Sequence, residues 1–308
     1  MTGKFYIDNQ DAYSLYRVLV TNNGYKELVS FPPLKSIESN NWAEEDGEEF
    51  DLSVPVLDTR ELSIRFACHG YDARFGAFVE SLSDKAYHDF NFTEIGKTYT
   101  LRLVSQPDMS QKHTLGAFSL RFADDFPLAG YSYLAPQSNI VPQRGYEIDG
   151  RDLSEYGVYI LRGSDTEIQK SPVVKKNLLQ NIKTKNGAIY DGKFVVFQTK
   201  EVKLNCLMRA NNLTEFWRNY NAFLFDLVRP EERLLYVDST GYEYPCYYKS
   251  CSVTEFSPIG KVWFEFSLTL VFTSFRVSGE EFLLASEDDI LIITEEDAFA
   301  IDLSIYGD

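Results

Sequence analysis

The sequence has little of the residues that most often hold metals or form disulfides. Its 308 residues include only three histidines and four cysteines. No histidine stands four residues from another or has a cysteine at metal-ligand spacing, so no metal site is expected. Cys68, Cys206, Cys246 and Cys251 show no paired spacing and are expected to be reduced core residues. Cys246 and Cys251 are five apart in a strand-like segment, which predicts opposite faces of a regular strand.

Catalytic motifs are also missing. The chain has no glycine-rich phosphate loop and no nucleophile elbow. His88 and Asp89 form the only close pair of a histidine and a carboxylate. Neighbouring residues do not face each other on a strand or a helix, so we expect a surface pair. The sequence indicates that the protein is not an enzyme and has no cofactor.

Long apolar runs are absent as well. No stretch approaches the roughly 18 residues that a membrane-spanning helix needs. Met1–Gln10 contains no apolar segment of the kind found in a signal peptide. We therefore expect no membrane partner, and synthesis in a reducing cytoplasm or in a particle assembled there.

Positive charge is scarce relative to negative charge. The formal net charge is −16, and residues 279–308 contain ten Asp/Glu and no Lys/Arg. The remaining 36 acidic and 30 basic residues give −6 for residues 1–278. Stable nucleic-acid binding needs clustered Lys/Arg, so it is disfavoured. A surface of this charge is compatible with DNA that passes by without specific binding.

Aromatic residues, in contrast, are abundant. Phe (23) and Tyr (20) make up most of a 15% aromatic share. Aromatic side chains suit half-buried pleated surfaces, so a strand-rich fold is the first expectation.

The chain contains an internal repeat. Phe5–Asp11 matches Tyr146–Asp152 at a shift of 141 residues, and Asp51–Phe66 matches Asp191–Cys206 at a shift of 140. Phe118–Leu120 matches Phe266–Leu268 at 148. Self-similarity of this kind predicts a tandem duplication. The linker Leu134–Gly145 places the boundary near Val141, giving domains at 1–140 and 141–278 and a C-terminal arm at 279–308.

Each copy has the same order of expected elements: strand, long polar loop, alternating strand, helix and further strands. The helices are expected at Asp72–Leu82 and Asn212–Leu227, with Asp72 and Asn212 as caps and apolar stripes that include Phe78 and Phe223. The later strands are expected at Tyr99–Val104, Ala117–Phe122, Glu243–Lys249 and Val262–Phe272. The fold class is therefore mainly β, with two tandem split β-barrel-like domains, each with one packed helix and a long loop.

The two long loops have opposite charge. Asn22–Asp51 carries a net −6 and Arg162–Lys193 a net +4. These loops either lie against each other, within one chain or between neighbouring chains, or are separately solvated, since exposed ion pairs contribute only about 0–1 kcal/mol each. The candidate interface residues are Glu44, Glu45, Asp46, Glu48 and Glu49 in the first loop and Lys175, Lys176, Lys183 and Lys185 in the second.

The C-terminal arm alternates apolar runs with acidic clusters. Phe282–Leu284, Ile290–Ile293 and Phe299–Ile305 are separated by Glu287–Asp289 and Glu295–Asp297. Disordered tails are usually poor in such runs, so we expect short strands that add to a sheet edge through residues such as Ile290 and Ile292. The alternative is a frayed terminus.

Tyr146–Gly157, with the sequence Tyr-Glu-Ile-Asp-Gly-Arg-Asp-Leu-Ser-Glu-Tyr-Gly, resembles the opening strand of the distal tail proteins of long-tailed bacteriophages. Phe5–Tyr16 is a weaker version of it. The acidic run Leu284–Asp297 resembles the C-terminal ends of phage and prophage proteins from gut Bacteroidetes. The element order is similar to the split-barrel fold of phage tail-tube, distal-tail and hub domains.

The resemblance implies a ring around the tail lumen, between the tail tube and the tip or baseplate. Its partners would be the tail-tube protein and the hub or tip proteins, and DNA would pass through it. The protein would belong to the virion tail and assemble in the cytoplasm of the host bacterium. Because the second domain looks like the first, the resemblance leaves two rings open: a hexamer with the second copy outside, or a trimer with pseudo-sixfold symmetry.

A carbohydrate-binding module for host adhesion is the alternative from another class. Tyr242, Tyr244, Tyr247 and Tyr248 could stack on sugar rings. Core or interface packing is the commoner use of such residues. Glycan binding by the isolated protein would favour this alternative.

Overall fold

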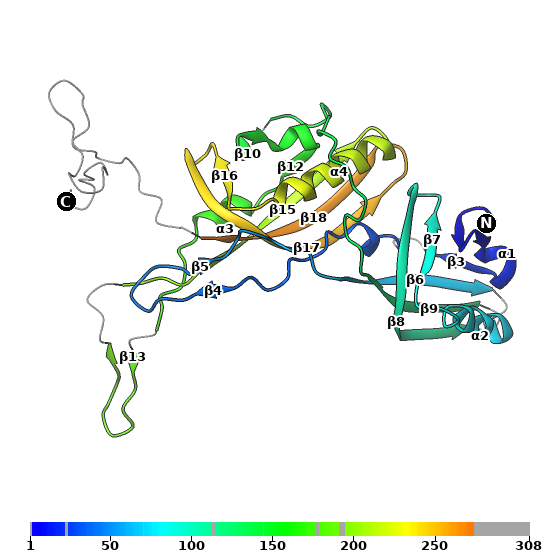
Figure 1. Cartoon of the computed structure of the whole chain (residues 1–308), viewed down its shortest axis with the longest axis horizontal. Coiled ribbons are helices and arrows are strands. Elements are labelled where there is room, and N and C mark those ends of the chain that lie inside the picture. Colours follow the sequence, from blue (N-terminus) through cyan, green and yellow to red (C-terminus); the bar gives the residue numbers. More distant parts are fainter. Residues whose placement is uncertain are drawn as a thin grey trace.

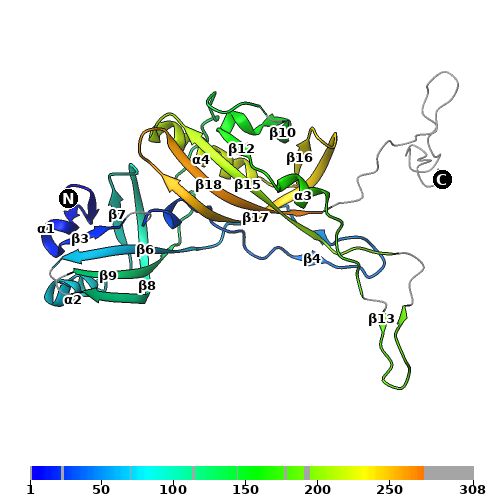
Figure 2. The same cartoon turned by 180° about the vertical axis from the view of Figure 1, so that it is seen from behind.

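The computed structural model describes residues 2–21, 24–69, 71–112, 115–143, 145–176, 179–190 and 195–273 (Figures 1 and 2). Within them the protein is mainly β, with two seven-stranded antiparallel sheets and few helices, which confirms the expected fold class. The expected C-terminal arm, with Ile290 and Ile292, lies outside the described residues.

The two large sheets have the same strand order. The first is ordered β2-β1-β7-β8-β9-β6-β3 and the second β11-β10-β16-β17-β18-β15-β12. The strands of the first sheet are β1 (Phe5–Ile7), β2 (Gln10–Asp11), β3 (Val18–Val20), β6 (Arg60–His69), β7 (His88–Phe92), β8 (Lys97–Lys112) and β9 (Leu115–Asp124). The strands of the second are β10 (Tyr146–Ile148), β11 (Arg151–Asp152), β12 (Val158–Ile160), β15 (Lys200–Ala210), β16 (Arg233–Val237), β17 (Tyr242–Ser257) and β18 (Val262–Phe272).

Short helices and two small hairpins occupy equivalent places in the two halves. The helices are α1 (Ala12–Tyr16), α2 (Tyr71–Ser81), α3 (Ser164–Gln169), α4 (Leu213–Leu227) and the 3-10 helices η1 (Glu27–Val29) and η2 (Leu153–Tyr156). The hairpins are β4–β5 (Ser39–Asn40, Glu49–Phe50) and β13–β14 (Leu179–Gln180, Ile189–Tyr190). The hairpins lie in the long loops, between β3 and β6 and between β12 and β15.

The aspartates of the repeated opening motif have the same structural role in both halves. Asp8 and Asp149 take positive φ angles of 49° and 52° at the tight turn after the first strand. A short polar side chain tolerates this conformation because it can hydrogen-bond locally. Asp8 Oδ1 accepts from the Asp89 amide at 3.0 Å, and Asp149 Oδ1 accepts from the Leu234 amide at 2.9 Å. Each turn is thereby fastened to the neighbouring strand.

His88 corrects one sequence expectation. Its side chain is buried rather than part of a surface pair, and its Nδ1 lies 2.7 Å from Asp8 Oδ2. His88 alternates with the exposed Asp89 along β7, so the strand directs the histidine into the fold. The contact therefore reinforces the β1–β2 turn.

The helices cover the sheet faces largely as expected. Asn212 Oδ1 caps α4 by accepting from the Glu215 amide at 2.9 Å, and Phe223 of the apolar stripe is 1% exposed. In the first half, α2 begins at Tyr71, so Asp72 lies within the helix and the expected cap is wrong.

A β-bulge corrects the prediction for Cys246 and Cys251. The register of β17 against β18 shifts between Tyr248 and Ser250, which lie between the two cysteines. An extra residue in one strand reverses the in–out alternation beyond it. Cys246 is buried, and Cys251 packs against the same core instead of facing the other way. All four cysteines are free.

Candidate assembly interface

Two long excursions carry the candidate interface residues. We define arm one as residues 30–58 and arm two as residues 170–198. Their bases have the same backbone pairing at a shift of 140, with an isolated bridge between Leu34 and Leu57 in arm one and between Val174 and Phe197 in arm two. The amide of Lys35 donates to Val56 O at 2.9 Å, and that of Lys175 donates to Val196 O at 2.7 Å.

The hairpin tips of the arms also match. Ser39 pairs with Phe50 in arm one, and Leu179 pairs with Tyr190 in arm two. Gly47 and Gly187 occupy the same tip position with φ of +67° and +80°, where an L side chain would be strained. The two arms therefore share one backbone pattern, with acidic side chains at one tip and lysines at the other.

Arm one covers an open edge of the second sheet. β16 pairs only with the Tyr242–Cys246 part of β17, which leaves the rest of that edge for another partner. The Leu34 amide donates to Lys249 O at 3.0 Å, and Ser30 Oγ donates to Cys251 O at 3.3 Å. Exposed strand edges invite pairing with other chains, and here the chain's own arm occupies the edge.

Phe31 anchors arm one in the second core. Its side chain is 1% exposed. The centroid of its ring lies 4.5, 5.9 and 5.6 Å from the ring centroids of Tyr220, Phe223 and Phe266. The Tyr220 and Tyr248 hydroxyls donate to the carbonyls of Ser30 and Pro32 at 3.1 and 2.9 Å. A residue of the first half thus completes the hydrophobic core of the second.

Arg60 holds the base of arm one. Its guanidinium is buried, donates to Leu28 O at 2.9 Å and Ser30 O at 2.6 Å, and pairs with Asp124 at 2.5 Å. At the equivalent position in the second half, Lys200 Nζ donates to Ile168 O. Burial costs a charged group free energy unless it is hydrogen-bonded, so these contacts fix where each arm leaves its sheet.

The two long loops do lie against each other within the chain. Lys175 is 3% exposed, and its Nζ donates to Asn41 Oδ1 at 2.8 Å, Trp42 O at 2.8 Å and Gly47 O at 2.6 Å. Phe197 completes the contact, because its amide donates to Asp46 Oδ1 at 2.8 Å and its carbonyl accepts from the Gly47 amide at 2.9 Å. We call the arrangement of Asn41, Trp42 and Gly47 around the ammonium the lysine cage.

This contact differs from the simple ion pairing that the loop charges suggest. The Lys175 ammonium meets amide and carbonyl oxygens, and Asp46 accepts a backbone amide. Glu48 accepts from Ser39 Oγ and Asn41 Nδ2 at 2.7 and 3.2 Å, so it braces its own hairpin. The structure therefore brings Asp46 and Lys175 together through the backbone of the tip.

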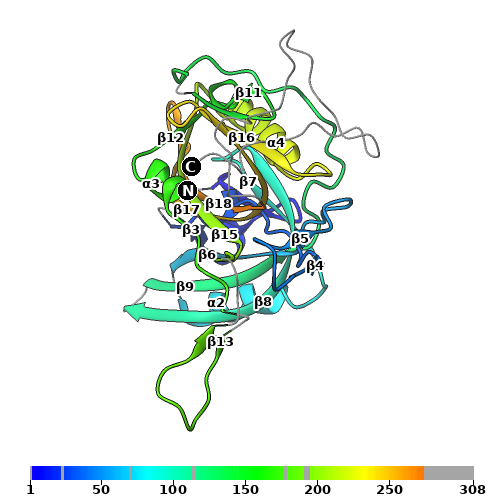
Figure 3. The same cartoon turned by 90° about the vertical axis from the view of Figure 1, so that its left-hand side faces the viewer.

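The remaining candidate residues lie apart. Glu44, Glu45, Glu49 and Lys176 are exposed. Lys183 and Lys185 are exposed at the tip of arm two, which projects away from both sheets (Figures 1 and 3). Within the described ranges, no ion pair joins these two lysines to the acidic tip.

The tyrosines behind the carbohydrate hypothesis lie mostly inside the protein. Tyr244 and Tyr248 are buried, and Tyr247 packs on Phe50 of arm one at 4.9 Å between ring centroids. Only Tyr242 of the four is substantially exposed, at 39%. They form packing surfaces for the core and for arm one.

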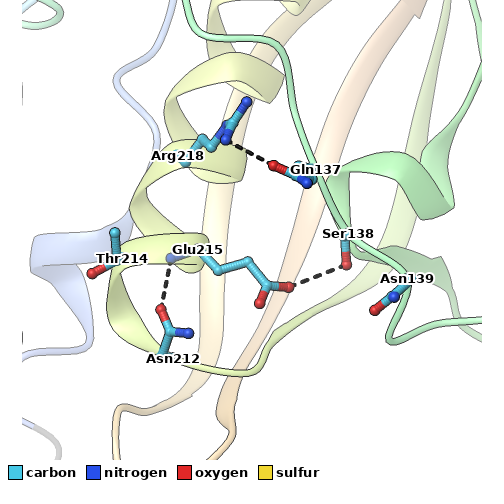
Figure 4. Close-up of a pocket in the computed structure, with 7 residues that line it drawn as sticks. All are labelled: Gln137, Ser138, Asn139, Asn212, Thr214, Glu215 and Arg218. Atoms are coloured by element: carbon cyan, nitrogen blue, oxygen red, sulfur yellow. Dashed lines mark hydrogen bonds between the residues drawn. The ribbon is translucent and has the colours of Figure 1, made fainter.

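A polar pocket of about 400 Å³ lies where the linker crosses the start of α4 (Figure 4). Its polar groups bond to one another: Arg218 Nη1 donates to Gln137 Oε1 at 2.9 Å, and Ser138 Oγ donates to Glu215 Oε1 at 3.5 Å. These hydrogen bonds therefore hold the linker against α4.

In the described part of the chain, no cluster of His, Cys, Asp and Glu could hold a metal ion. None of its helices is long and apolar enough to cross a membrane.

No protein-family model and no curated protein matches the chain. Among solved structures, the chain is similar to the SPP1 Dit protein, a hub component of the adsorption apparatus in phages that infect Gram-positive bacteria. The alignment covers 88% of this chain and 98% of that chain, with 12% identity and a TM-score of 0.30. A TM-score this low does not establish a common fold.

Proposed function

We propose that the protein is a structural component of a phage tail that assembles into a ring at the distal end, between the tail tube and the tip or baseplate. The observation that carries the proposal is the contact between the two sheets. An arm from one sheet covers the free edge of a second sheet with the same strand order, and a contact of this kind can repeat from copy to copy.

Tandem duplication of one ancestral domain accounts for the repeat. The sequence matches at shifts of 140 to 148 are accompanied by equivalent turns at Asp8 and Asp149 and equivalent bridges in the two arms. The opening motif, which resembles that of distal tail proteins, contains the aspartates that make these turns. This gives the motif a physical reason to recur in each copy.

Of the two rings left open by the sequence, this contact favours the one in which the two sheets alternate. In that arrangement, three chains would supply six sheets, two from each chain. The expected number of six sheets in a ring comes from the resemblance to tail proteins. In the hexamer with the second domain outside, the two sheets would not alternate around the ring. DNA would pass through the lumen without specific binding, in keeping with the net −6 of residues 1–278.

The proposal includes no enzymatic activity, no cofactor and no membrane partner. A role in host glycan binding receives no support from the four tyrosines, because only Tyr242 is substantially exposed. A glycan array with the purified protein tests that alternative separately.

Electron microscopy tests the proposed function. Particles of the purified protein should average to closed rings with a central opening, and antibodies against the chain should label virions at the distal end of the tail. Labelling of the capsid or of the tail shaft would overturn the proposed location. Open filaments instead of rings would overturn the proposed closure.

A further inference from the structure

Arm two carries the residues equivalent to those of the lysine cage. Asn181, Ile182 and Gly187 stand at the positions of Asn41, Trp42 and Gly47 at a shift of 140. The tip turn is the same, because the amide of Lys185 donates to Ile182 O at 3.0 Å just as that of Glu45 donates to Trp42 O at 3.5 Å. Among the described residues, no lysine side chain is hydrogen-bonded to these three residues.

The matching lysine is also present. Lys35 stands at the position of Lys175 at a shift of 140, at the base of arm one. Its backbone makes the same bond as that of Lys175, but its side chain is exposed. The neighbouring Leu57 corresponds to Phe197, which binds Gly47 and Asp46 within the chain. The ammonium of Lys175 thus lies in the lysine cage, whereas the side chain of Lys35 is exposed.

The β8 edge of the first sheet matches the β17 edge of the second sheet. Leu103 and Val104 of β8 correspond to Tyr248 and Lys249 of β17 at a shift of 145, and each strand has its first bulge there. Arm one covers the β17 edge, whereas β7 pairs with β8 only as far as Leu101. Over the described residues, neither an arm nor a strand covers this edge at Val104, which is 39% exposed.

From this we infer that arm two docks on the first sheet of a second copy of the chain, with Lys35 of that copy seated in the cage of Asn181, Ile182 O and Gly187 O. Residues 170–174 then run along the β8 edge of the second copy, as residues 30–34 run along β17 within the chain. The inference rests on the proposed self-assembly and adds which surfaces meet.

Charge favours this partner. Residues 1–140 contain 12 Lys/Arg and 20 Asp/Glu, a net −8, whereas residues 141–278 contain 18 and 16, a net +2. A head-to-tail order brings domains of opposite charge together, which speeds encounter and disfavours like-with-like contacts. The two surfaces of the contact are different, so the association is heterologous and extends until it closes on itself.

The contact between copies is expected to be weaker than the one within the chain. Ser171 stands where Phe31 anchors arm one, so no aromatic ring enters the neighbouring core. The tip of arm two also lacks the five carboxylates of residues 44–49. Loss of a hydrogen-bonded ammonium should therefore be enough to separate the copies.

Two variants break opposite sides of this contact. Lys35→Met removes the ammonium. Gly187→Val places a β-branched residue where φ is +80°, which strains the tip turn even though an added Cβ meets no atom within 4 Å. Each should raise the dissociation constant between copies about tenfold to hundredfold. Far-ultraviolet circular dichroism of the dilute, dissociated protein should show the parent fold in both variants. Lys203→Met, on an exposed position of β15, is the matched control and should assemble like the parent protein.

The two variants are then mixed, with one of them isotopically labelled. Native mass spectrometry identifies the assemblies that form. The Lys35→Met chain keeps an intact cage and the Gly187→Val chain keeps Lys35, so the mixture should form one-to-one dimers that grow no further. If the parent protein assembles but either variant alone assembles equally well, or the mixture gives no dimer, the inference is wrong and the proposed self-assembly stands. A parent protein that stays monomeric contradicts both.

Discussion

The ammonium of Lys175 donates a 2.6 Å hydrogen bond to the carbonyl of Gly47, which lies 128 residues earlier in the chain. This bond joins the base of arm two to the tip of arm one. Together with the insertion of Phe31 under α4, it makes the two sheets one cooperative structure. The sheets are therefore expected to unfold together, although the sequence divides into two similar halves.

Replacing Lys175 with Met should lower the free energy of unfolding by about 2 kcal/mol, because hydrogen bonds from a charged donor contribute about 1.5–3 kcal/mol and the substitution leaves the carbonyl of the buried Gly47 without this donor. Urea denaturation measures the change. Lys176→Met, at the exposed neighbouring position, should change it by less than about 0.5 kcal/mol. Equal effects of the two substitutions would contradict the caged role of Lys175.

Phe31→Ala should lower the free energy of unfolding by about 3–5 kcal/mol, the usual cost of removing a buried phenylalanine. It should also separate the single unfolding transition into two, because the anchor of one half in the core of the other is lost. Calorimetry detects both effects. Phe126, which is 49% exposed, supplies the control, since Phe126→Ala should leave one transition.

Phe223→Ala tests the packed face of α4. We expect a loss of about 3–5 kcal/mol for this side chain, which is 1% exposed and touches Phe31 and Tyr156. Phe225, on the same helix and 36% exposed, should cost clearly less when replaced by Ala. A loss well under 1 kcal/mol at Phe223 would show that this face does not support the core.

Acid should destabilise the fold through specific carboxylates. The hydrogen bond from Arg102 lowers the pKa of Asp125 below its usual 3.8, and the bonds from Lys4 and Tyr25 lower the pKa of Glu94 below its usual 4.5. The folded state thus binds these protons more weakly than the unfolded chain. Stability from these groups is present above the usual pKa values and is lost as pH falls through the lowered ones.

The measurement is the free energy of unfolding from about pH 6 to about pH 2. Asp125→Asn should reduce its decline in acid, because the linked proton site is gone. Asn9→Ala in the β1–β2 turn, which removes no carboxylate, should leave the slope unchanged. A slope unaffected by Asp125→Asn would contradict the assigned role of the Arg102 contact.

Much of the fold could be predicted because its signals are local. Period-two alternation places β6 and β15, the Asn212 cap starts α4, and the repeat fixes the order of elements in both halves. The order of elements along the chain was expected for each copy, whereas the order of strands within each sheet was not predicted. The prediction for Cys251 was wrong because a bulge depends on the register between two paired strands. The sequence of one strand alone does not reveal that register.

The assembly surfaces were harder to foresee. The loop charges left contact and separate solvation open. The acceptors for Lys175 are two backbone carbonyls and a side-chain amide oxygen, which charge counting cannot identify. Phe31 stands beside two prolines in a polar loop, and its burial depends on a core more than 180 residues later in the chain. Comparing equivalent positions at a shift of 140 would have singled out Lys35 and Lys175, since the lysine is retained in both copies.

The most direct test of the central claim, that this chain builds a closed ring from its own repeat, is the mass of the purified protein in solution. Multi-angle light scattering across a range of concentrations should give a defined multiple of 35.4 kDa, threefold for the ring in which the two sheets alternate. A sixfold mass would support the ring with the second domain outside. A mass of 35.4 kDa at every concentration would contradict the account.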